Sequence, residues 1–313
     1  METERLKKKI LDARSVKIEK MIACCDEVYA IAEKADNREL LGFLYFYKGE
    51  AYYIRNQIKL MFEYMTKAIP YLSETRQWEL LSRAYNIMAI TAINRGNAPV
   101  AVDYYLDALE CAREHNLSLD ECRIHINLGY LYMQNEIYQE ANEQFMAANE
   151  IYEKSHDKEK QLGRLLMIYT NLAGCWMLQG KTDRAGEYVR RLNEQCRPYF
   201  KTMDYVYVGC MEARYYNECG ETEVRDEIIH EIMDRLENPD KFDGPLPILD
   251  LFDDLYSLCE LTFEIGKYDI CAQIIGELES AIEKTDIINL ERKLLALKIQ
   301  YYKSQNDMEK YKN

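Results

Sequence analysis

The stretch YNIMAITAINRGNAPVAVDYYLDA, from Tyr85 to Ala108, carries small and aromatic residues at fixed gaps. Its marked positions are Tyr85, Met88, Ala89, Ala92, Gly96, Ala101, Tyr105 and Ala108. The gaps between them are 3, 1, 3, 4, 5, 4 and 3 residues. Gaps of three and four place side chains on one face of a helix, so the stretch predicts two helices joined near Gly96.

The same gaps recur before and after this stretch. One copy comprises His125, Leu128, Gly129, Tyr132, Glu136, Ala141, Phe145 and Ala148. The next comprises Tyr169, Leu172, Ala173, Trp176, Gly180, Ala185, Val189 and Leu192. An earlier copy comprises Tyr45, Lys48, Gly49, Tyr52, Asn56, Met61, Met65 and Ala68. Weaker copies contain Ala213, Tyr216 and Gly220, and then Leu255, Leu258, Cys259, Gly266 and Cys271.

Each copy has the properties of a helical hairpin. The Gly or Asn that follows the aromatic residue suits the left-handed backbone that ends a first helix. The small residue five positions later allows the second helix to approach the first closely. Because one hairpin cannot bury both of its faces, neighbouring hairpins must stack.

These positions resemble the tetratricopeptide repeat (TPR), and the resemblance covers most of the chain. It implies an all-α fold, a right-handed α-solenoid of antiparallel helix hairpins. The small anchor residues Gly49, Ala89, Gly129, Ala173, Ala213, Cys259 and Ile299 follow one another by 40, 40, 44, 40, 46 and 40 residues. The usual TPR period is about 34 residues. We therefore expect helices about one turn longer than usual, with linkers between the hairpins.

We predict a single solenoid over residues 1–313. Residues 1–36 form an N-terminal helical cap and 37–237 form five hairpins. The proline-rich segment 238–247 is an irregular loop, and 248–313 form a last hairpin and an incomplete one. Ser118 with Glu121, and Asp36 with Glu39, have the spacing of capping boxes. Because a solenoid normally ends in a polar capping helix, we expect the natural chain to continue beyond Asn313.

Composition disfavours several classes of protein. The net charge is −14, and no basic stripe offers a surface for nucleic acid or an anionic membrane. No apolar stretch approaches the roughly 20 residues needed to cross a bilayer. Because the first residues resemble no signal peptide, we expect a cytoplasmic protein with reduced thiols. Most of the 10 cysteines are therefore interpreted as small core residues.

Motifs for catalysis or cofactor binding are absent from the sequence. It contains no glycine-rich phosphate loop, no GxSxG elbow and no cysteine or histidine pair at zinc spacing. His125 occupies a core-type repeat position, so we interpret it as a packed residue and not as a base. We expect no enzyme activity in this segment, no metal and no cofactor.

Candidate binding residues lie on the first helices, which line the concave groove in TPR solenoids. Asn127 and Asn171 each precede their anchor by two residues, and we add Asn86 of the preceding hairpin. An amide can donate to and accept from a peptide backbone. This arrangement resembles the asparagine ladder of kinesin light chains and of cytosolic quorum-sensing peptide receptors. The alternative is that these amides bond to neighbouring loops or helix ends.

Two arginines and several apolar residues complete the candidate groove. Arg83 and Arg123 each precede an anchor by six residues, and together they suit a carboxylate. Their alternative is pairing with acids of the chain itself. The apolar candidates are Phe46, Tyr53, Ile90, Ile93, Tyr130, Met133, Met177 and Phe263; residues at this spacing belong to a core more often than to a ligand site. Lys48 is misplaced for the chaperone-tail clamp of eukaryotic TPR domains, so that clamp is not carried over.

Three functions fit a protein- or peptide-binding TPR module. The main hypothesis is the sensory, regulatory N-terminal part of a bacterial signalling protein, because the sequence resembles the TPR region of GGDEF-type diguanylate cyclases. In that family such a region biases dimer geometry, so a homodimer is compatible with this hypothesis. The alternatives are a cytosolic quorum-sensing-type peptide receptor and a free-standing protein-assembly scaffold.

Overall fold

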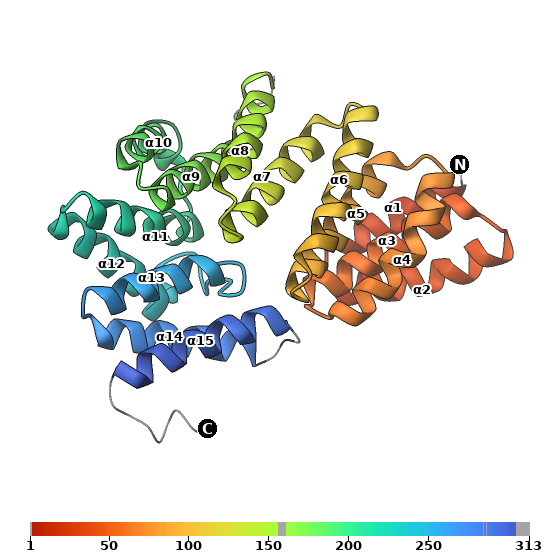
Figure 1. Ribbon diagram of the computed structural model, residues 1–313. Helices are drawn as coiled ribbons and strands as arrows, with labels where there is room; N and C mark the ends of the chain where they lie inside the picture. Colours follow the sequence, from red (N-terminus) through yellow and green to blue (C-terminus); the bar gives the residue numbers. More distant parts are fainter. Residues whose placement is uncertain (1, 156–160, 284, 286, 305–313) are drawn as a thin grey trace. The chain divides into compact units, whose positions relative to one another are not determined.

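The computed structural model describes residues 2–155, 161–283, 285 and 287–304. Within these residues the chain forms 15 α-helices and no strand (Figure 1). The helices are α1 (Glu2–Arg14), α2 (Ile18–Lys34), α3 (Arg38–Ile54), α4 (Ile58–Glu74), α5 (Trp78–Asn94), α6 (Ala98–Glu114), α7 (Ser118–Gln134), α8 (Tyr138–Glu153), α9 (Leu162–Leu178), α10 (Thr182–Gln195), α11 (Thr202–Glu218), α12 (Thr222–Glu237), α13 (Phe252–Glu264), α14 (Tyr268–Ile282) and α15 (Ile288–Ser304). The prediction of an all-α repeat fold is confirmed.

Helix length explains the 40-residue period. Helices α3 to α7 each contain 17 residues and are joined by three-residue turns. The prediction of longer helices is therefore confirmed. The expectation of linkers between hairpins is wrong in this part of the chain, since the turn between α4 and α5 is as short as the turn within a hairpin.

The turns share one backbone geometry. A residue with positive φ ends successive helices every 20 residues, at Asp36, Asn56, Arg76, Gly96, Asn116 and Glu136. The next amide then bonds back to the helix it has left, as Asn97 N does to the Ala92 carbonyl at 2.8 Å. This is the Schellman pattern, which satisfies carbonyls at the helix end. It confirms the predicted role of Gly96 and Asn56, and it extends to the second helices, where the sequence analysis had not placed it.

Substitutions at these turns should separate backbone strain from packing. We expect Gly96→Ala, at φ 73°, to lower the free energy of unfolding by about 1 kcal/mol, because a Cβ is strained in the left-handed region. Glu136→Gly, at φ 62°, should leave stability unchanged or raise it. Urea unfolding measures both. Gly163→Ala is the control, because Gly163 lies in α9 and its added Cβ meets nothing within 4 Å; an equal loss in that control would refute the explanation.

Both predicted capping boxes are wrong. Asp36 has a positive φ, and the cap of α3 is the next residue, Asn37, whose side chain accepts a hydrogen bond from Leu40 N at 3.0 Å. Ser118 is the first residue of α7, after Leu117, whose carbonyl accepts from Glu121 N at 2.9 Å, and the Glu121 carboxylate accepts from Arg113 at 2.9 Å. The Schellman turn fixes where each following helix begins, and this shifts the cap relative to the sequence motif.

The cysteines behave as core residues. All ten are free thiols, and every one except Cys219 is buried, which confirms the interpretation of most of them. Cys259 stands at a small-anchor position, and its Sγ lies 3.0 Å from Cys271 Sγ on the partner helix of its hairpin. A small side chain at this position allows the two helices to approach closely.

Contacts divide the chain into two compact units. Unit 1 comprises residues 1–125 with 285–289, and unit 2 comprises 126–284 with 290–313. In unit 1, α3 packs on α4 and α5 packs on α6; in unit 2, α9 packs on α10, α11 on α12 and α13 on α14. The proline-rich segment 238–247 holds one short 3-10 helix, Pro239–Lys241. The prediction of one continuous solenoid stays a prediction, and its last residues, 305–313, lie outside the described residues.

Candidate functional site

Unit 2 contains a cavity of about 370 Å³ lined by four helices. All four are first helices of their hairpins, the helices that the sequence analysis assigned to a groove. The lining residues are Tyr130, Met133 and Gln134 of α7; Thr170, Asn171, Gly174, Met177 and Leu178 of α9; Tyr207, Cys210, Met211, Arg214 and Glu218 of α11; and Asp253, Asp254, Ser257, Glu260 and Glu264 of α13. A volume of this size lies within the usual range of ligand sites.

One face of each helix supplies the lining. Along α9 the lining residues Thr170, Asn171, Gly174, Met177 and Leu178 recur once per helical turn, three or four residues from Gly174 or beside such a position, and the other helices show the same pattern. The lining positions also keep a fixed register to the small anchors. The residue directly after each anchor contributes in every helix, as Tyr130, Gly174, Arg214 and Glu260. The repeat therefore determines which positions of each helix line the cavity, and the residue types at these positions determine which groups a ligand would contact.

Four predicted groove residues meet in this cavity: Tyr130, Met133, Asn171 and Met177. Asn171 is buried, and its amide lies close enough to the Tyr207 hydroxyl to lower the pKa of that tyrosine. Asn127 is half-buried and lies outside the lining set, as does Phe263. The structure thus brings one of the proposed ladder amides into the cavity, and the peptide-ladder hypothesis stays a prediction.

The other predicted residues lie in unit 1. Arg83 donates to the buried Glu50 at 2.6 Å, and Arg123 pairs with Asp120 at 2.8 Å. Both arginines therefore follow the alternative interpretation, pairing with acids of the chain. Phe46 is fully buried, with the Arg83 guanidinium 5.0 Å from its ring centre. Its assignment to a groove surface is wrong, because tight packing in the core excludes a ligand.

The remaining candidates of unit 1 are buried or half-buried. Asn86 is buried in α5, and Tyr53, Ile90 and Ile93 are half-buried. His125 is buried and lies 3.1 Å from Arg113 Nη2. The interpretation of His125 as a packed residue is confirmed.

The acidic half of the cavity could not be recognised from the strong repeat copies. Asp253, Asp254, Glu260 and Glu264 of α13 and Arg214 of α11 were not singled out. They belong to the two weakest repeat copies, in which few aromatic positions mark the register. A signal was available in the register to the anchors. Asn171 and Gly174 lie two before and one after the anchor Ala173, and the same offsets from Ala213 and Cys259 give Met211, Arg214, Ser257 and Glu260.

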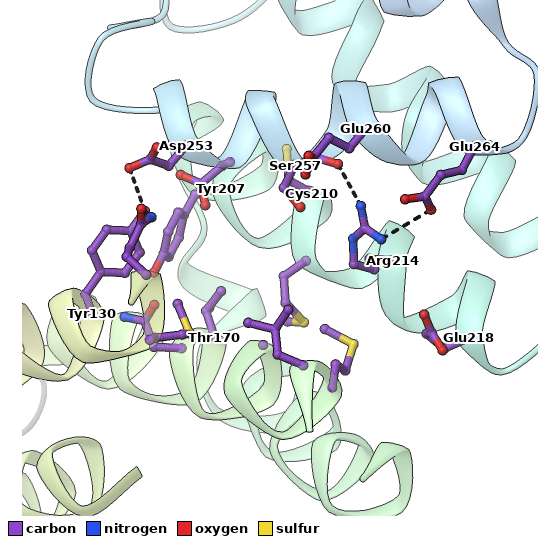
Figure 2. Close-up of a pocket in the computed structure, with 18 residues that line it drawn as sticks. Tyr130, Thr170, Tyr207, Cys210, Arg214, Glu218, Asp253, Ser257, Glu260 and Glu264 are labelled. Atoms are coloured by element: carbon purple, nitrogen blue, oxygen red, sulfur yellow. Dashed lines mark hydrogen bonds and ion pairs between the residues drawn. The ribbon is translucent and has the colours of Figure 1, made fainter. Parts of the chain in front are cut away.

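Hydrogen bonds fix both ends of the cavity wall. The Tyr130 hydroxyl donates to Asp253 Oδ2 at 2.8 Å, and Gln134 Nε2 donates to that hydroxyl at 2.7 Å. Arg214 donates to Glu264 at 3.4 Å and to the Ser257 carbonyl at 3.1 Å. In Figure 2 the Tyr130–Asp253 contact lies on the left and Arg214 lies on the right. Contacts within the chain thus hold both ends of the wall.

Burial perturbs the titratable groups of this wall. The pKa of Asp254 lies well above its ordinary value, because burial and the neighbouring Asp253 carboxylate both disfavour the charged form. Burial and the charge of Asp254 also raise the pKa of Tyr207, against a hydrogen bond from Asn171. Burial and Asp253 raise the pKa of Tyr130. The cavity therefore disfavours further negative charge.

The described residues offer no cluster of three or more histidine, cysteine, aspartate or glutamate side chains arranged to hold a metal ion. Among the same residues, no helix has the length and apolar character required to cross a membrane.

No family model matches the chain, and no curated protein matches its sequence. Solved structures do match its fold. The apo form of RapI aligns with a TM-score of 0.70 and 17% identity, over 94% of this chain and 99% of RapI. The apo form of the quorum sensor NprR from B. thuringiensis aligns with a TM-score of 0.65 and 15% identity, over 97% and 83% of the two chains. The structure of NprR in complex with its cognate peptide NprX aligns with a TM-score of 0.63 and 16% identity, over 96% of this chain and 87% of NprR.

The fold is that of TPR-like helical-repeat proteins. Identities this low establish the architecture and leave function to be argued from the site itself.

Proposed function

We propose that this chain is a peptide receptor without catalytic activity and that the cavity of unit 2 is its binding site. One observation carries the proposal: single faces of four first helices enclose about 370 Å³ and present both apolar and hydrogen-bonding groups. Methionine side chains, here Met133, Met177 and Met211, adapt to varied apolar groups. Amides and carboxylates between them can fix a peptide backbone and its polar side chains.

The structural neighbours support a peptide ligand. NprR, a quorum sensor, binds its cognate peptide NprX with a similar arrangement of helices. This likeness supports the alternative, a quorum-sensing-type peptide receptor, more than the main hypothesis, a sensory region of a diguanylate cyclase. The structures reported above are not diguanylate cyclase sensory regions, so the GGDEF link and the homodimer stay predictions. Free thiols at all ten cysteines fit a reducing compartment, and we place the receptor in the cytoplasm.

Filling the cavity tests the proposal. Gly174 lies on α9 in the lining, and a Cβ added there meets nothing within 4 Å. We expect Gly174→Phe to fold normally and to lower peptide affinity by roughly 100-fold, because its ring occupies the space of the ligand. The measurement is retention of short peptides from a random library, followed by native mass spectrometry and titration of those retained.

The matched control is Gly163→Phe. Gly163 lies on the same helix, is exposed, and also has nothing within 4 Å of an added Cβ, but it is outside the cavity. This variant should bind as the parent does. The proposal fails when the parent retains no peptide, or when Gly174→Phe and Gly163→Phe bind equally well.

A further inference from the structure

The cavity has a strong excess of negative charge. Its lining contains five carboxylates against the single guanidinium of Arg214. The carboxylates belong to Glu218, Asp253, Asp254, Glu260 and Glu264. Arg214 is itself engaged, since it donates to Glu264 and to the Ser257 carbonyl. The carboxyl groups outnumber the cations in contact with them, Arg214 and Lys293, so the wall favours a cationic ligand over an anionic one.

Two adjacent carboxylates of α13 differ in their partners. Asp253 accepts from Lys293 Nζ at its Oδ1, at 2.6 Å, and from the Tyr130 hydroxyl at its Oδ2, at 2.8 Å. Among the residues that the structure describes, no side chain donates a hydrogen bond to Asp254. Its carboxyl lines the cavity, half-buried beside the charge of Asp253. A donor group of a ligand can therefore form a hydrogen bond or an ion pair with the Asp254 carboxyl.

Lys293 of α15 already acts as a cation at this end of the cavity. Its Nζ contacts Asp253 Oδ1 and, at 2.7 Å, Gln134 Oε1. With Tyr130, these residues form a network that we call the latch: Tyr130, Gln134, Asp253 and Lys293. The latch joins α7, α13 and α15: Asp253 lies 123 residues from Tyr130, and Lys293 lies 159 residues from Gln134 and 40 from Asp253.

The latch is weak enough to be exchanged. The side chains of Lys293 and Asp253 are each 27% exposed, so water and an incoming charge can reach the pair. Partly exposed ion pairs contribute little net stability and can be replaced by a competing cation at small cost. A cation bound at Asp254 lies beside Asp253, where it also repels the Lys293 ammonium.

We propose that the ligand of this cavity is a cationic peptide, whose guanidinium or ammonium group binds Asp254 and displaces Lys293 from Asp253, opening the latch between α7, α13 and α15. The inference rests on the proposed function, because it names the chemical class of the peptide and the contact that binding breaks. An acidic peptide is excluded, since it adds negative charge next to carboxylates that are already costly to ionise.

Matched peptides test the charge requirement. One retained peptide is synthesised with arginine, with citrulline, which keeps the shape and loses the charge, and with glutamate at the same position. We expect the arginine form to bind roughly tenfold or more tightly than the citrulline form and the glutamate form to bind weakest. Asp254→Asn should remove the difference between arginine and citrulline. It should not unfold the protein, because the Asp254 carboxyl accepts no hydrogen bond from another side chain among the described residues, and the isosteric amide relieves the repulsion from Asp253.

A second variant tests the displacement. Lys293→Met removes the internal competitor and should raise the affinity for the arginine peptide several-fold. The matched control is Lys298→Met, on the same helix, where the lysine pairs with Glu279 at 2.5 Å and is also 27% exposed. Affinity that is unchanged or lowered in Lys293→Met relative to Lys298→Met overturns the displacement.

Affinity should also depend on pH in a defined direction. A bound cation favours the charged form of Asp254, so binding releases a proton from a carboxyl whose pKa is raised. Affinity for the arginine peptide should therefore increase as the pH rises above the ordinary pKa of an aspartate and through the range in which Asp254 loses its proton, and the slope should flatten in Asp254→Asn. The other charged or titratable groups that line the cavity or contact its lining are Tyr130, Tyr207, Cys210, Arg214, Glu218, Asp253, Glu260, Glu264 and Lys293. The raised pKa values of Tyr130, Tyr207 and Cys210 keep these three neutral over this range.

The outcomes separate the two proposals. Retention of neutral or acidic peptides that Gly174→Phe abolishes leaves the peptide receptor standing and overturns the cationic class. Equal binding of the arginine and citrulline forms does the same. Failure to retain any peptide overturns the receptor itself.

Discussion

Gly129→Val is expected to lower the free energy of unfolding by about 3 kcal/mol, a large effect for one side chain. Gly129 is the small anchor of α7, and a Cβ built on it lies 2.7 Å from Phe145 Cε1 and 2.8 Å from Cδ1. Phe145 of α8 is fully buried, so its ring cannot turn aside without displacing other core residues. Urea unfolding followed by circular dichroism measures the loss.

Two comparisons isolate the cause of this loss. At Gly49 an added Cβ meets Met65 Cε at 2.9 Å, and the flexible end of a methionine can move. Gly49→Ala should therefore cost less than Gly129→Ala. Combining Gly129→Ala with Phe145→Leu should restore part of the stability, as a double-mutant cycle with strong coupling. Additive losses in that cycle would show that Gly129 and Phe145 do not constrain each other.

Glu50→Ala is expected to destabilise the protein by about 3 kcal/mol, through loss of a buried charged contact in unit 1. The Glu50 side chain is 8% exposed and accepts from Arg14 Nε at 2.7 Å and from Arg83 Nη2 at 2.6 Å. Removing it leaves Arg83 without its carboxylate beside the ring of Phe46. The expected loss stays at the lower end of the range for buried pairs because Arg14 is 44% exposed and reaches water.

Glu63→Ala is the matched control for Glu50→Ala. Glu63 accepts from Lys67 at 2.5 Å, but the two side chains are 53% and 48% exposed. Solvent screens such a pair, so its loss should cost no more than about 0.5 kcal/mol. Both variants are compared by urea unfolding at the same ionic strength. Similar losses in the two would mean that burial does not set the strength of the Glu50 contacts.

The repeat could be predicted because the residue types that signal it follow from contacts between residues close in the sequence. A glycine or asparagine that must adopt positive φ, such as Gly96 or Asn56, is visible as a residue type at a fixed gap. An anchor such as Gly129 is small because a neighbouring helix passes close to it. These constraints act within about 20 residues, and the sequence displays them directly. The same reasoning failed at Asp36 and Ser118, where a cap motif was present but the turn began the helix elsewhere.

The candidate site was predicted in part. Tyr130, Met133, Asn171 and Met177 were found because they stand next to strong anchors. Phe46 and Arg83 occupy similar helical positions, yet one is buried in the core and the other pairs with Glu50. Helical spacing gives the face of a helix, but the exposure of that face depends on which helices pack beside it. This is a property of long-range packing.

The sequence alone determined the building unit: paired helices of a 40-residue period with small anchors and left-handed turns, because short-range sterics and helical periodicity write these features into residue types. Only the tertiary structure decided which first helices enclose a cavity, and that Asp253, Tyr130 and Lys293 meet across more than 100 residues. Side-chain charges carry no information about their partners until distant helices are brought together, so the acidic cavity and its latch emerge only from the folded chain.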